Sequence, residues 1–144
     1  KNKEIILRTN FFGPGRPWRK SFSDWIIQEL TAENPITVFT DSFFTPIGLA
    51  QLCSKIQELL QRKATGVFNV AGAERLSKFE FAYCLAKYLG LRTDLIKPGK
   101  IVGAHLNAPR PSDMSLSVEK IEAFLAKKMP ALDECFASLD RNVN

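Results

Sequence analysis

The pattern of apolar and polar positions predicts strands that alternate with helices. Residues 4–9 contain the continuous apolar run Ile5-Ile6-Leu7, which is typical of a strand covered on both faces. Residues 66–72 form a second run of this kind, bounded by glycines. Because each run is followed by a helical pattern, we expect residues 4–9 and 66–70 to be parallel neighbours in one sheet. Residues 36–40 alternate apolar and polar side chains, which predicts a short, half-exposed strand.

Three helices have clear start signals. Ser21 with Asp24, and Ser77 with Glu80, have the spacing of a capping box. Thr45-Pro46 predicts a further start, with the threonine as N-cap and the proline at the first helical position. In chain order, we expect these helices to end at Asn34-Pro35, at about Leu60 and at Gly90. The apolar stripe of the first helix, which we interpret as core, consists of Phe22, Trp25, Ile26 and Leu30.

The remaining third of the chain has weaker signals. We expect residues 91–105 to be irregular and two helices to follow, near residues 117–127 and 130–139. The overall order indicates an α/β fold, but only two strands have the pattern of central strands, too few for a complete parallel sheet. Because the first strand also opens the chain with nothing before it to pair with, we expect the chain to be a piece of a longer protein.

The segment after the first strand contains two glycines, Gly13 and Gly15, as a phosphate-binding turn would. The third glycine of a dinucleotide fingerprint is missing, however, and Pro14 and Pro17 lack the N–H groups that such a loop uses. We therefore interpret the segment as an irregular loop. Asn10, at the end of the strand, is better placed for function, because ligands of open α/β sheets bind beyond the carboxyl ends of the strands.

Composition narrows the classes of function. The 144 residues are 45% hydrophobic and 24% charged, which is ordinary for a soluble domain. The formal net charge of +5 is compatible with an anionic ligand. The basic residues are scattered and form no run of the kind that binds nucleic acid, so we expect no nucleic-acid partner. No apolar run approaches the length of a membrane span and no signal peptide is visible, so we expect a cytoplasmic protein without membrane contact.

Cysteine and histidine usage argues against a metal site. Three cysteines cannot all pair, and Cys53 and Cys84 fall within apolar helical patterns, which predicts buried thiols in a reducing compartment. The third is Cys135. The single histidine, His105, has no cluster of metal ligands around it in the sequence, so we predict no metal.

The segment around Arg110 is the strongest candidate for a binding site. Pro109 and Pro111 flank this arginine and hold it on a stiff, non-helical backbone. A guanidinium in a fixed orientation suits an anion with several oxygens. Asp113 could orient Arg110, or it could help to start the helix that is expected near Ser117. The alternative is a surface loop whose arginine is solvated.

Four stretches, in this order, resemble the C-terminal half of an extended short-chain dehydrogenase/reductase of the dTDP-4-dehydrorhamnose reductase branch. They are residues 5–13 (IILRTNFFG), 43–47 (FFTPI), 66–72 (GVFNVAG) and 108–116 (APRPSDMSL). The resemblance implies a partial Rossmann-like fold with few strands and several helices. It implies that residues 1–144 are the C-terminal substrate-binding portion and that the N-terminal cofactor-binding part is absent.

The resemblance also implies where the chemistry lies. The family's Gly-rich dinucleotide loop and catalytic Tyr-x-x-x-Lys pair precede the region where this chain begins, so no catalytic residue is expected here. Tyr83 and Lys87 have the same spacing, but they fall late in the chain, on a helix that the resemblance assigns to packing. The cofactor, NADP or NAD, would be held mainly by the missing part.

Five site residues follow from the resemblance. Thr9 and Asn10 are expected to approach the nicotinamide, and Asn10 and Phe11 to approach the sugar. Arg110 matches the family's diphosphate contact, and Asp113 belongs to the same substrate-binding segment. Many rhamnose-forming reductases carry a tryptophan near the strand end where this chain has Asn10-Phe11-Phe12, so the sugar itself is left open.

The function implied is the substrate-binding part of an NAD(P)-dependent reductase of 4-keto sugar nucleotides. Such an enzyme belongs to dTDP-rhamnose and polysaccharide biosynthesis, has a nucleotide sugar as its partner, and is compatible with a homo-oligomer. The chain alone is expected to be inactive. The alternative is a non-catalytic regulatory or binding subunit with the same fold, and the presence of Tyr-x-x-x-Lys upstream would discriminate between the two.

Overall fold

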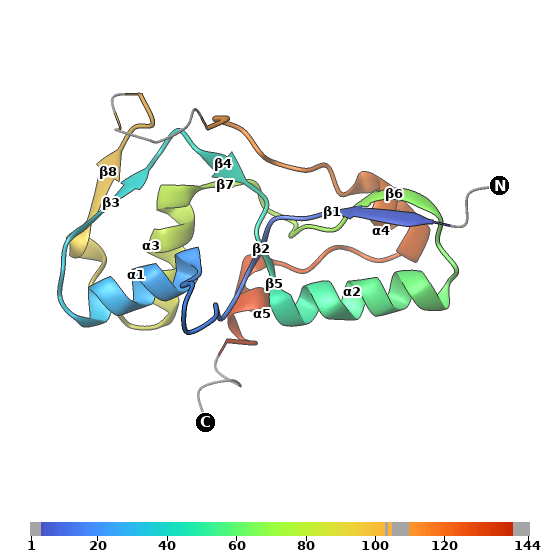
Figure 1. Ribbon diagram of the computed structural model, residues 1–144, viewed down its shortest axis with the longest axis horizontal. Coiled ribbons are helices and arrows are strands. Elements are labelled where there is room, and N and C mark those ends of the chain that lie inside the picture. The colour runs from blue at the N-terminus through green and yellow to red at the C-terminus, as the bar shows by residue number, and fades with distance from the viewer. Residues whose placement is uncertain (1–3, 103, 105–109, 140–144) are drawn as a thin grey trace. The chain divides into compact units, whose positions relative to one another are not determined.

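The computed structural model describes residues 4–102, 104 and 110–139 (Figure 1). Helices and strands alternate along most of this length, as the sequence predicts. In chain order the elements are β1 (Ile5–Arg8), β2 (Phe11–Phe12), α1 (Phe22–Thr31), β3 (Ile36–Phe39), β4 (Phe43–Phe44), β5 (Ile47–Gly48), α2 (Leu49–Gln61), β6 (Gly66–Asn69), β7 (Leu76–Ser77), α3 (Lys78–Tyr88), the 3₁₀ turn η1 (Thr93–Leu95), β8 (Ile96–Gly99), α4 (Glu119–Leu125) and α5 (Leu132–Phe136).

The chain forms two compact units, each assembled from segments that are distant in sequence. The first unit contains the residues up to Phe12, Thr45–Glu74 and the residues from Ser115 onward, and the second contains Gly13–Phe44 and Arg75–Met114. Each unit has its own buried core. That of the first includes Ile47, Leu59, Val70, Ile121, Leu125 and Phe136, and that of the second includes Ile26, Leu30, Phe81 and Leu85.

In the first unit, β1 and β6 form a parallel pair, which confirms that prediction. Their register places Leu7 opposite Phe68. One face of this pair is covered, since Phe68 is 3% exposed and packs edge-on against Phe124 of α4, with ring centres 5.2 Å apart. The other face is not covered, since Ile6 is 55% exposed. The prediction of a strand buried on both faces is therefore wrong for this chain, because side chains alternate along a strand and α4 covers one face only.

The predicted helix start at Thr45-Pro46 is also wrong. Helix α2 begins three residues after Pro46, at Leu49, with Gly48 as its N-cap. Before it, Ile47 and Gly48 form the short strand β5, which pairs in parallel with β2. The Thr45 hydroxyl binds Asn10 and Leu116 instead of capping a helix. Tertiary hydrogen bonds thus override a favourable local capping signal.

In the second unit, both predicted capping boxes are present. The Ser21 hydroxyl accepts from the backbone N–H of Asp24, and the Asp24 carboxylate accepts from that of Ser21. Ser77 and Glu80 make the same pair of hydrogen bonds at the start of α3. Gly90, with φ +68°, follows the C-cap of α3, as predicted.

Two short strand pairs complete the second unit. Strand β3 pairs in parallel with β8, so the expectation that residues 91–105 are irregular is wrong over η1 and β8. The sequence Ile-Lys-Pro-Gly of β8 has no alternating pattern, and its extended form depends on this pairing. Strand β4 pairs antiparallel with β7. The backbone of Phe43 in β4 also donates to the carbonyl of Ser112 (2.7 Å) and accepts from the N–H of Met114 (2.9 Å), which anchors that part of the chain.

The cysteines differ from their predicted environments. Cys53 is exposed and Cys84 is half-buried, whereas Cys135 is fully buried in the first unit. Cys53 is exposed because it lies outside the apolar stripe with which α2 packs. Burial raises the pKa of the Cys135 thiol, which favours its neutral form. Among the residues that the structure describes, no helix combines the length and apolarity of a membrane span.

Candidate functional site

The first candidate site lies where β1 ends, in the first unit. The side-chain oxygen of Asn10 accepts hydrogen bonds from the backbone N–H (3.3 Å) and the hydroxyl (3.1 Å) of Thr45. The Thr45 hydroxyl in turn accepts from the N–H of Leu116 (3.2 Å). The backbone carbonyl of Asn10 accepts from the N–H of Ile47 (3.1 Å). Thr45 therefore connects three segments of the unit and fixes the side-chain position of Asn10, although the sequence did not single it out for this site.

Thr9, immediately before Asn10, carries an unsatisfied buried hydroxyl. Its Oγ1 is shielded from solvent and has no hydrogen-bond partner among the described residues. A buried hydroxyl without a partner costs about 1–3 kcal/mol, so such groups are rare in proteins. A polar group that the described residues do not supply would satisfy this hydroxyl.

Phe11 is exposed to 59%, although it lies in a strand, whereas its neighbour Phe12 is buried against Phe136 with ring centres 5.7 Å apart. Pairing of β2 with β5 holds the backbone of Phe11 opposite Ile47. An exposed aromatic ring on a fixed backbone can pack against the apolar face of a ligand ring. Thr9, Asn10 and Phe11 are consecutive residues. They carry, in turn, a hydroxyl without a partner among the described residues, an amide fixed by Thr45 and an exposed ring.

The second candidate site lies in the second unit. The carboxylate of Asp113 is held by Arg75, whose Nη2 and Nε lie 2.7 Å and 3.1 Å from the same oxygen. The Arg75 guanidinium also lies over the Phe43 ring, 3.8 Å from its centre. Of the two alternatives for Asp113, the one in which it helps to start a helix is wrong, because α4 begins six residues later at Glu119. Asp113 instead ties its segment to Arg75 and β4.

Arg110 is exposed, and among the described residues its guanidinium has no hydrogen-bond or ion-pair partner. Asp113, the acidic residue three positions later, is engaged by Arg75. Pro111, one of the two flanking prolines, is exposed, while His105 and Pro109 lie outside the described residues. The guanidinium of Arg110 is therefore available to an anion from outside the described part of the chain.

Lys78, which the sequence did not single out, lies in the same unit as Arg110. It is the first residue of α3, and its Nζ lies 3.3 Å from the centre of the Phe44 ring. Burial, together with the positive charge of Arg110, lowers the pKa of Lys78 to about 8. The sequence carried no signal for this, because a lysine that follows a capping serine normally faces solvent. Its environment depends on the pairing of β4 with β7.

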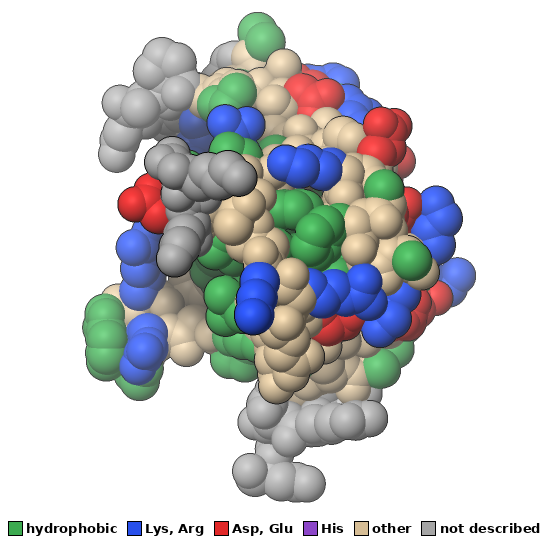
Figure 2. All heavy atoms as spheres, turned by 90° about the vertical axis from the view of Figure 1, so that its right-hand side faces the viewer, with side chains coloured by type: hydrophobic (Ala, Val, Ile, Leu, Met, Phe, Trp, Pro, Cys, Tyr) green, Lys and Arg blue, Asp and Glu red, His purple; other side chains and the backbone are tan. Residues whose placement is uncertain are grey.

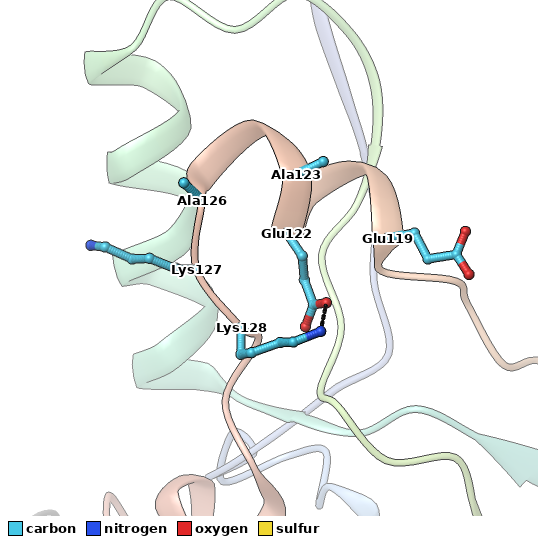
Figure 3. A pocket seen from close by; sticks show the side chains of 6 residues that line it. All are labelled: Glu119, Glu122, Ala123, Ala126, Lys127 and Lys128. Carbon is cyan, nitrogen blue, oxygen red and sulfur yellow. Dashed lines mark hydrogen bonds and ion pairs between the residues drawn. The ribbon is translucent and has the colours of Figure 1, made fainter.

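Other features of the described residues do not form a comparable site. In the hollow beside α4, Glu122 is paired with Lys128 (2.8 Å), and Glu119 points away from that pair (Figure 3). Lys127, which also lines it, is paired with Glu58 (3.0 Å). Tyr83 and Lys87 are both exposed on α3. No group of three or more potential metal ligands occurs among the described residues. On the face in Figure 2, basic side chains lie among apolar and acidic ones.

Comparison with known proteins gives one family match. A family described as "RmlD substrate binding domain" matches residues 1–141. A curated relative, "Probable low-salt glycan biosynthesis reductase Agl14" of Haloferax volcanii, is 26% identical over 139 residues. That alignment covers 94% of this chain and 46% of the relative, so the chain spans about half the length of the curated protein that it matches.

Solved structures have the same fold. The dTDP-4-dehydrorhamnose reductase of Bacillus anthracis, solved in complex with NADP, matches with a TM-score of 0.86 and 22% identity, over 99% of this chain and 50% of that one. A hypothetical dTDP-4-dehydrorhamnose reductase from Sulfolobus tokodaii matches with a TM-score of 0.78 and 28% identity, over 94% of this chain and 47% of that one. These matches confirm a partial Rossmann-like fold of the extended short-chain dehydrogenase/reductase type.

Proposed function

Because this chain belongs to the family of RmlD substrate binding domains, we propose that it is the substrate-binding part of an NAD(P)-dependent reductase of 4-keto sugar nucleotides. The substrate class is that named for the structural neighbours, a dTDP-4-dehydro sugar. The observation that carries the proposal is the exposed guanidinium of Arg110, which has no partner among the described residues. A diphosphate offers several anionic oxygens, and one guanidinium can engage two of them.

In this proposal, residues 1–144 bind and orient the substrate, and an N-terminal part supplies the dinucleotide loop and the Tyr-x-x-x-Lys pair. Arg110 binds the diphosphate, while Asp113, held by Arg75, keeps the Arg110 segment against β4. Fixing these groups before the substrate binds reduces the entropy lost in reaching a reactive geometry.

The residues at the end of β1 would contact the cofactor and the sugar. A bound nicotinamide would supply the hydride for reduction of the 4-keto group. The Thr9 hydroxyl would bind the cofactor's carboxamide, which supplies the partner that it lacks among the described residues. Asn10, fixed by Thr45, would hold its amide between cofactor and sugar, and the exposed ring of Phe11 would pack against the substrate.

Replacement of Arg110 tests the proposal. A charged hydrogen bond to phosphate contributes about 1.5–3 kcal/mol, so Arg110→Ala in the full-length parent protein should weaken dTDP binding about tenfold to a hundredfold. Arg110→Lys should restore only part of the affinity, because the charge is kept and the planar fork of donors is lost. Calorimetric titration of dTDP into the parent and both variants measures these changes.

Arg92→Ala is the matched control, because Arg92 is an exposed arginine of the same unit whose partners are Asp94 and Glu33. It should bind dTDP like the parent. If Arg110→Ala also binds dTDP like the parent, with an unchanged circular dichroism spectrum, Arg110 is a solvated loop residue and the proposal fails. A parent protein that binds dTDP but does not oxidise NADPH with a dTDP-4-keto sugar would be the non-catalytic binding subunit.

A further inference from the structure

The ammonium of Lys78 rests on an aromatic platform within the second unit. Its Nζ lies 3.3 Å from the centre of the Phe44 ring and 4.9 Å from that of Phe22. Both rings pack on Phe81, which is fully buried, at centre-to-centre distances of 5.4 Å and 5.8 Å. Three elements, α1, β4 and α3, therefore fix the position of this cation, and the faces of the two rings favour its charged form.

The platform leaves the hydrogen-bonding capacity of the ammonium unused. Within the described part of the chain, Nζ of Lys78 has no hydrogen-bond acceptor and no ion-pair partner. A lysine ammonium has three donors, and partial burial separates it from the water that would otherwise accept from them. An acceptor from outside the described residues would satisfy it.

The carboxylates on the surrounding elements are engaged by other donors. Their partners are the backbone N–H groups of Gly15 and Ser21 for Asp24, that of Ile101 for Asp41, that of Ser77 for Glu80, and the Arg75 guanidinium for Asp113. The charged group whose field acts on Lys78 is Arg110, and its effect is repulsive. Strand β4 lies between the two segments that carry these cations, because Phe43 pairs with Ser77, next to Lys78, and its N–H donates to the carbonyl of Ser112, two residues after Arg110. Neither cation has a carboxylate partner among the described residues.

Burial and the repulsion from Arg110 lower the pKa of Lys78 to about 8, so the free protein begins to lose this charge just above neutral pH. An anion placed between the two cations would reverse both effects. It would supply an acceptor for the ammonium and offset the repulsion, and it would therefore raise the pKa of Lys78.

We propose that Lys78 is a second phosphate-binding residue, which acts together with Arg110 on the same anionic group. This inference rests on the proposed function for the nature of the ligand, a nucleoside diphosphate sugar. Arg110 contributes a fork of donors from a loop, and Lys78 contributes a charge whose position the aromatic platform fixes. Because the anion binds the protonated form of Lys78, binding above about pH 8 takes up a proton.

Calorimetry of the full-length parent protein in buffers of different ionisation enthalpy measures this uptake. With dTDP as the probe, we expect little uptake at about pH 7 and a large fraction of one proton at about pH 9, where the phosphates of dTDP are already ionised. Lys78→Gln should weaken binding about tenfold to a hundredfold at about pH 7 and should abolish the uptake at about pH 9.

Lys78→Arg separates a binding role from a structural one. A guanidinium stays charged throughout this range, so this variant should bind dTDP well at both pH values without proton uptake. Lys87→Gln is the matched control, because Lys87 is an exposed lysine on the same helix, and it should behave like the parent. A second titration with inorganic pyrophosphate tests the anion site without the nucleoside.

The outcomes distinguish this inference from the proposed function. If Lys78→Gln binds dTDP as tightly as the parent, with unchanged proton uptake, the inference fails and the proposed function stands. If pyrophosphate binds with proton uptake that Lys78→Gln abolishes, while dTDP binds no better than pyrophosphate, the anion site stands and the nucleotide-sugar function fails. If the parent binds neither anion, both are wrong.

Discussion

At the scale of single residues, the second unit holds its basic side chains in two different ways. Arg75 is neutralised by Asp113 and stacks on Phe43, which is a stable structural arrangement. Lys78 lies over Phe44 in a partly buried position, with Arg110 as a repulsive neighbour. The rings favour the charged form of Lys78, but burial and the repulsion from Arg110 outweigh them, since the pKa is lowered. The net cost to the folded state is a property that a mutation can measure.

Lys78→Met should therefore stabilise the chain at neutral pH. The pKa of Lys78 is about 8 in the folded state, against 10.5 as its ordinary value. Below about pH 8 both states carry the proton and the folded state bears the full cost, whereas between about pH 8 and 10.5 the folded state releases its proton first, so stability rises with pH. The shift in pKa corresponds to a loss of about 3 kcal/mol of unfolding free energy without solvent screening, and of about 1–2 kcal/mol with it.

Urea titrations at several pH values measure this effect. Lys78→Met should have a higher free energy of unfolding than the unchanged chain. The difference should be largest below about pH 8 and should shrink as the pH rises above it. Lys87→Met, on the same helix, serves as the control for replacing a lysine by methionine. Parallel pH profiles for Lys78→Met and the unchanged chain would show that the lysine is not destabilised by its surroundings.

At the scale of elements, the helix starts show where local sequence decides the structure and where tertiary contacts do. The boxes at Ser21 and Ser77 form as their sequences predict, because every partner lies within three residues. Thr45-Pro46 has an equally favourable local signal and fails, because Asn10 and Leu116, both far away in sequence, engage the Thr45 hydroxyl. A local signal is thus reliable only where no distant partner competes for the same group.

Ser77→Ala should weaken the start of α3. The Ser77 hydroxyl accepts from the N–H of Glu80 (3.1 Å), and its loss leaves that N–H without its cap. Removal of such a cap costs about 1 kcal/mol of unfolding free energy. Urea denaturation followed by circular dichroism measures the loss, with Ser54→Ala, at an exposed position within α2, as the control.

The control should be neutral or slightly stabilising, because alanine is the better helix former in a helix interior. If Ser77→Ala is as stable as the unchanged chain, the capping box is present but does not contribute to stability. The backbone N–H and, to a smaller extent, the hydroxyl of Ser77 hold the pKa of Glu80 below its usual range. Because the variant loses only the hydroxyl, the pKa of Glu80 should rise part of the way toward its usual value, which gives an independent measure.

At the scale of the whole molecule, the chain covers about half of the proteins that it resembles. One face of the β1–β6 pair exposes Ile6 to 55% and Val67 to 36%, although both strands have the composition of buried strands. The chain contains neither a complete dinucleotide fingerprint nor a tyrosine and lysine pair in the position that the family uses. In the proposed function, residues 1–144 would bind the substrate, and an N-terminal part would supply the groups for hydride transfer.

The 144-residue chain by itself should not oxidise NADPH in the presence of a dTDP-4-keto sugar, because hydride transfer requires a bound cofactor and an acid, which the proposed function assigns to an N-terminal part. The rate of loss of NADPH absorbance should equal that of a reaction without protein. Circular dichroism shows whether the chain is folded under the assay conditions, and the full-length parent serves as the active reference. Steady oxidation by the chain alone would contradict this division of roles.

The sequence by itself determined the features that depend on near neighbours or on composition. Two capping boxes, the parallel pairing of residues 4–9 with 66–70, and the family were all predictable from it. Arg110 was identified as a candidate because its flanking prolines are adjacent in sequence. Its proposed contact with a diphosphate, like the roles of Thr9, Asn10 and Phe11, remains a prediction.

Only the tertiary structure decided which polar groups have partners. Asp113 pairs with Arg75, Thr45 fixes Asn10, and the hydroxyl of Thr9 is left buried without a partner among the described residues. Lys78 is held on Phe44 because two-residue strands pair across more than thirty positions of sequence. Such short strands have no periodicity of their own, and burial and electrostatic repulsion arise only when distant segments meet, so no local pattern could have predicted them.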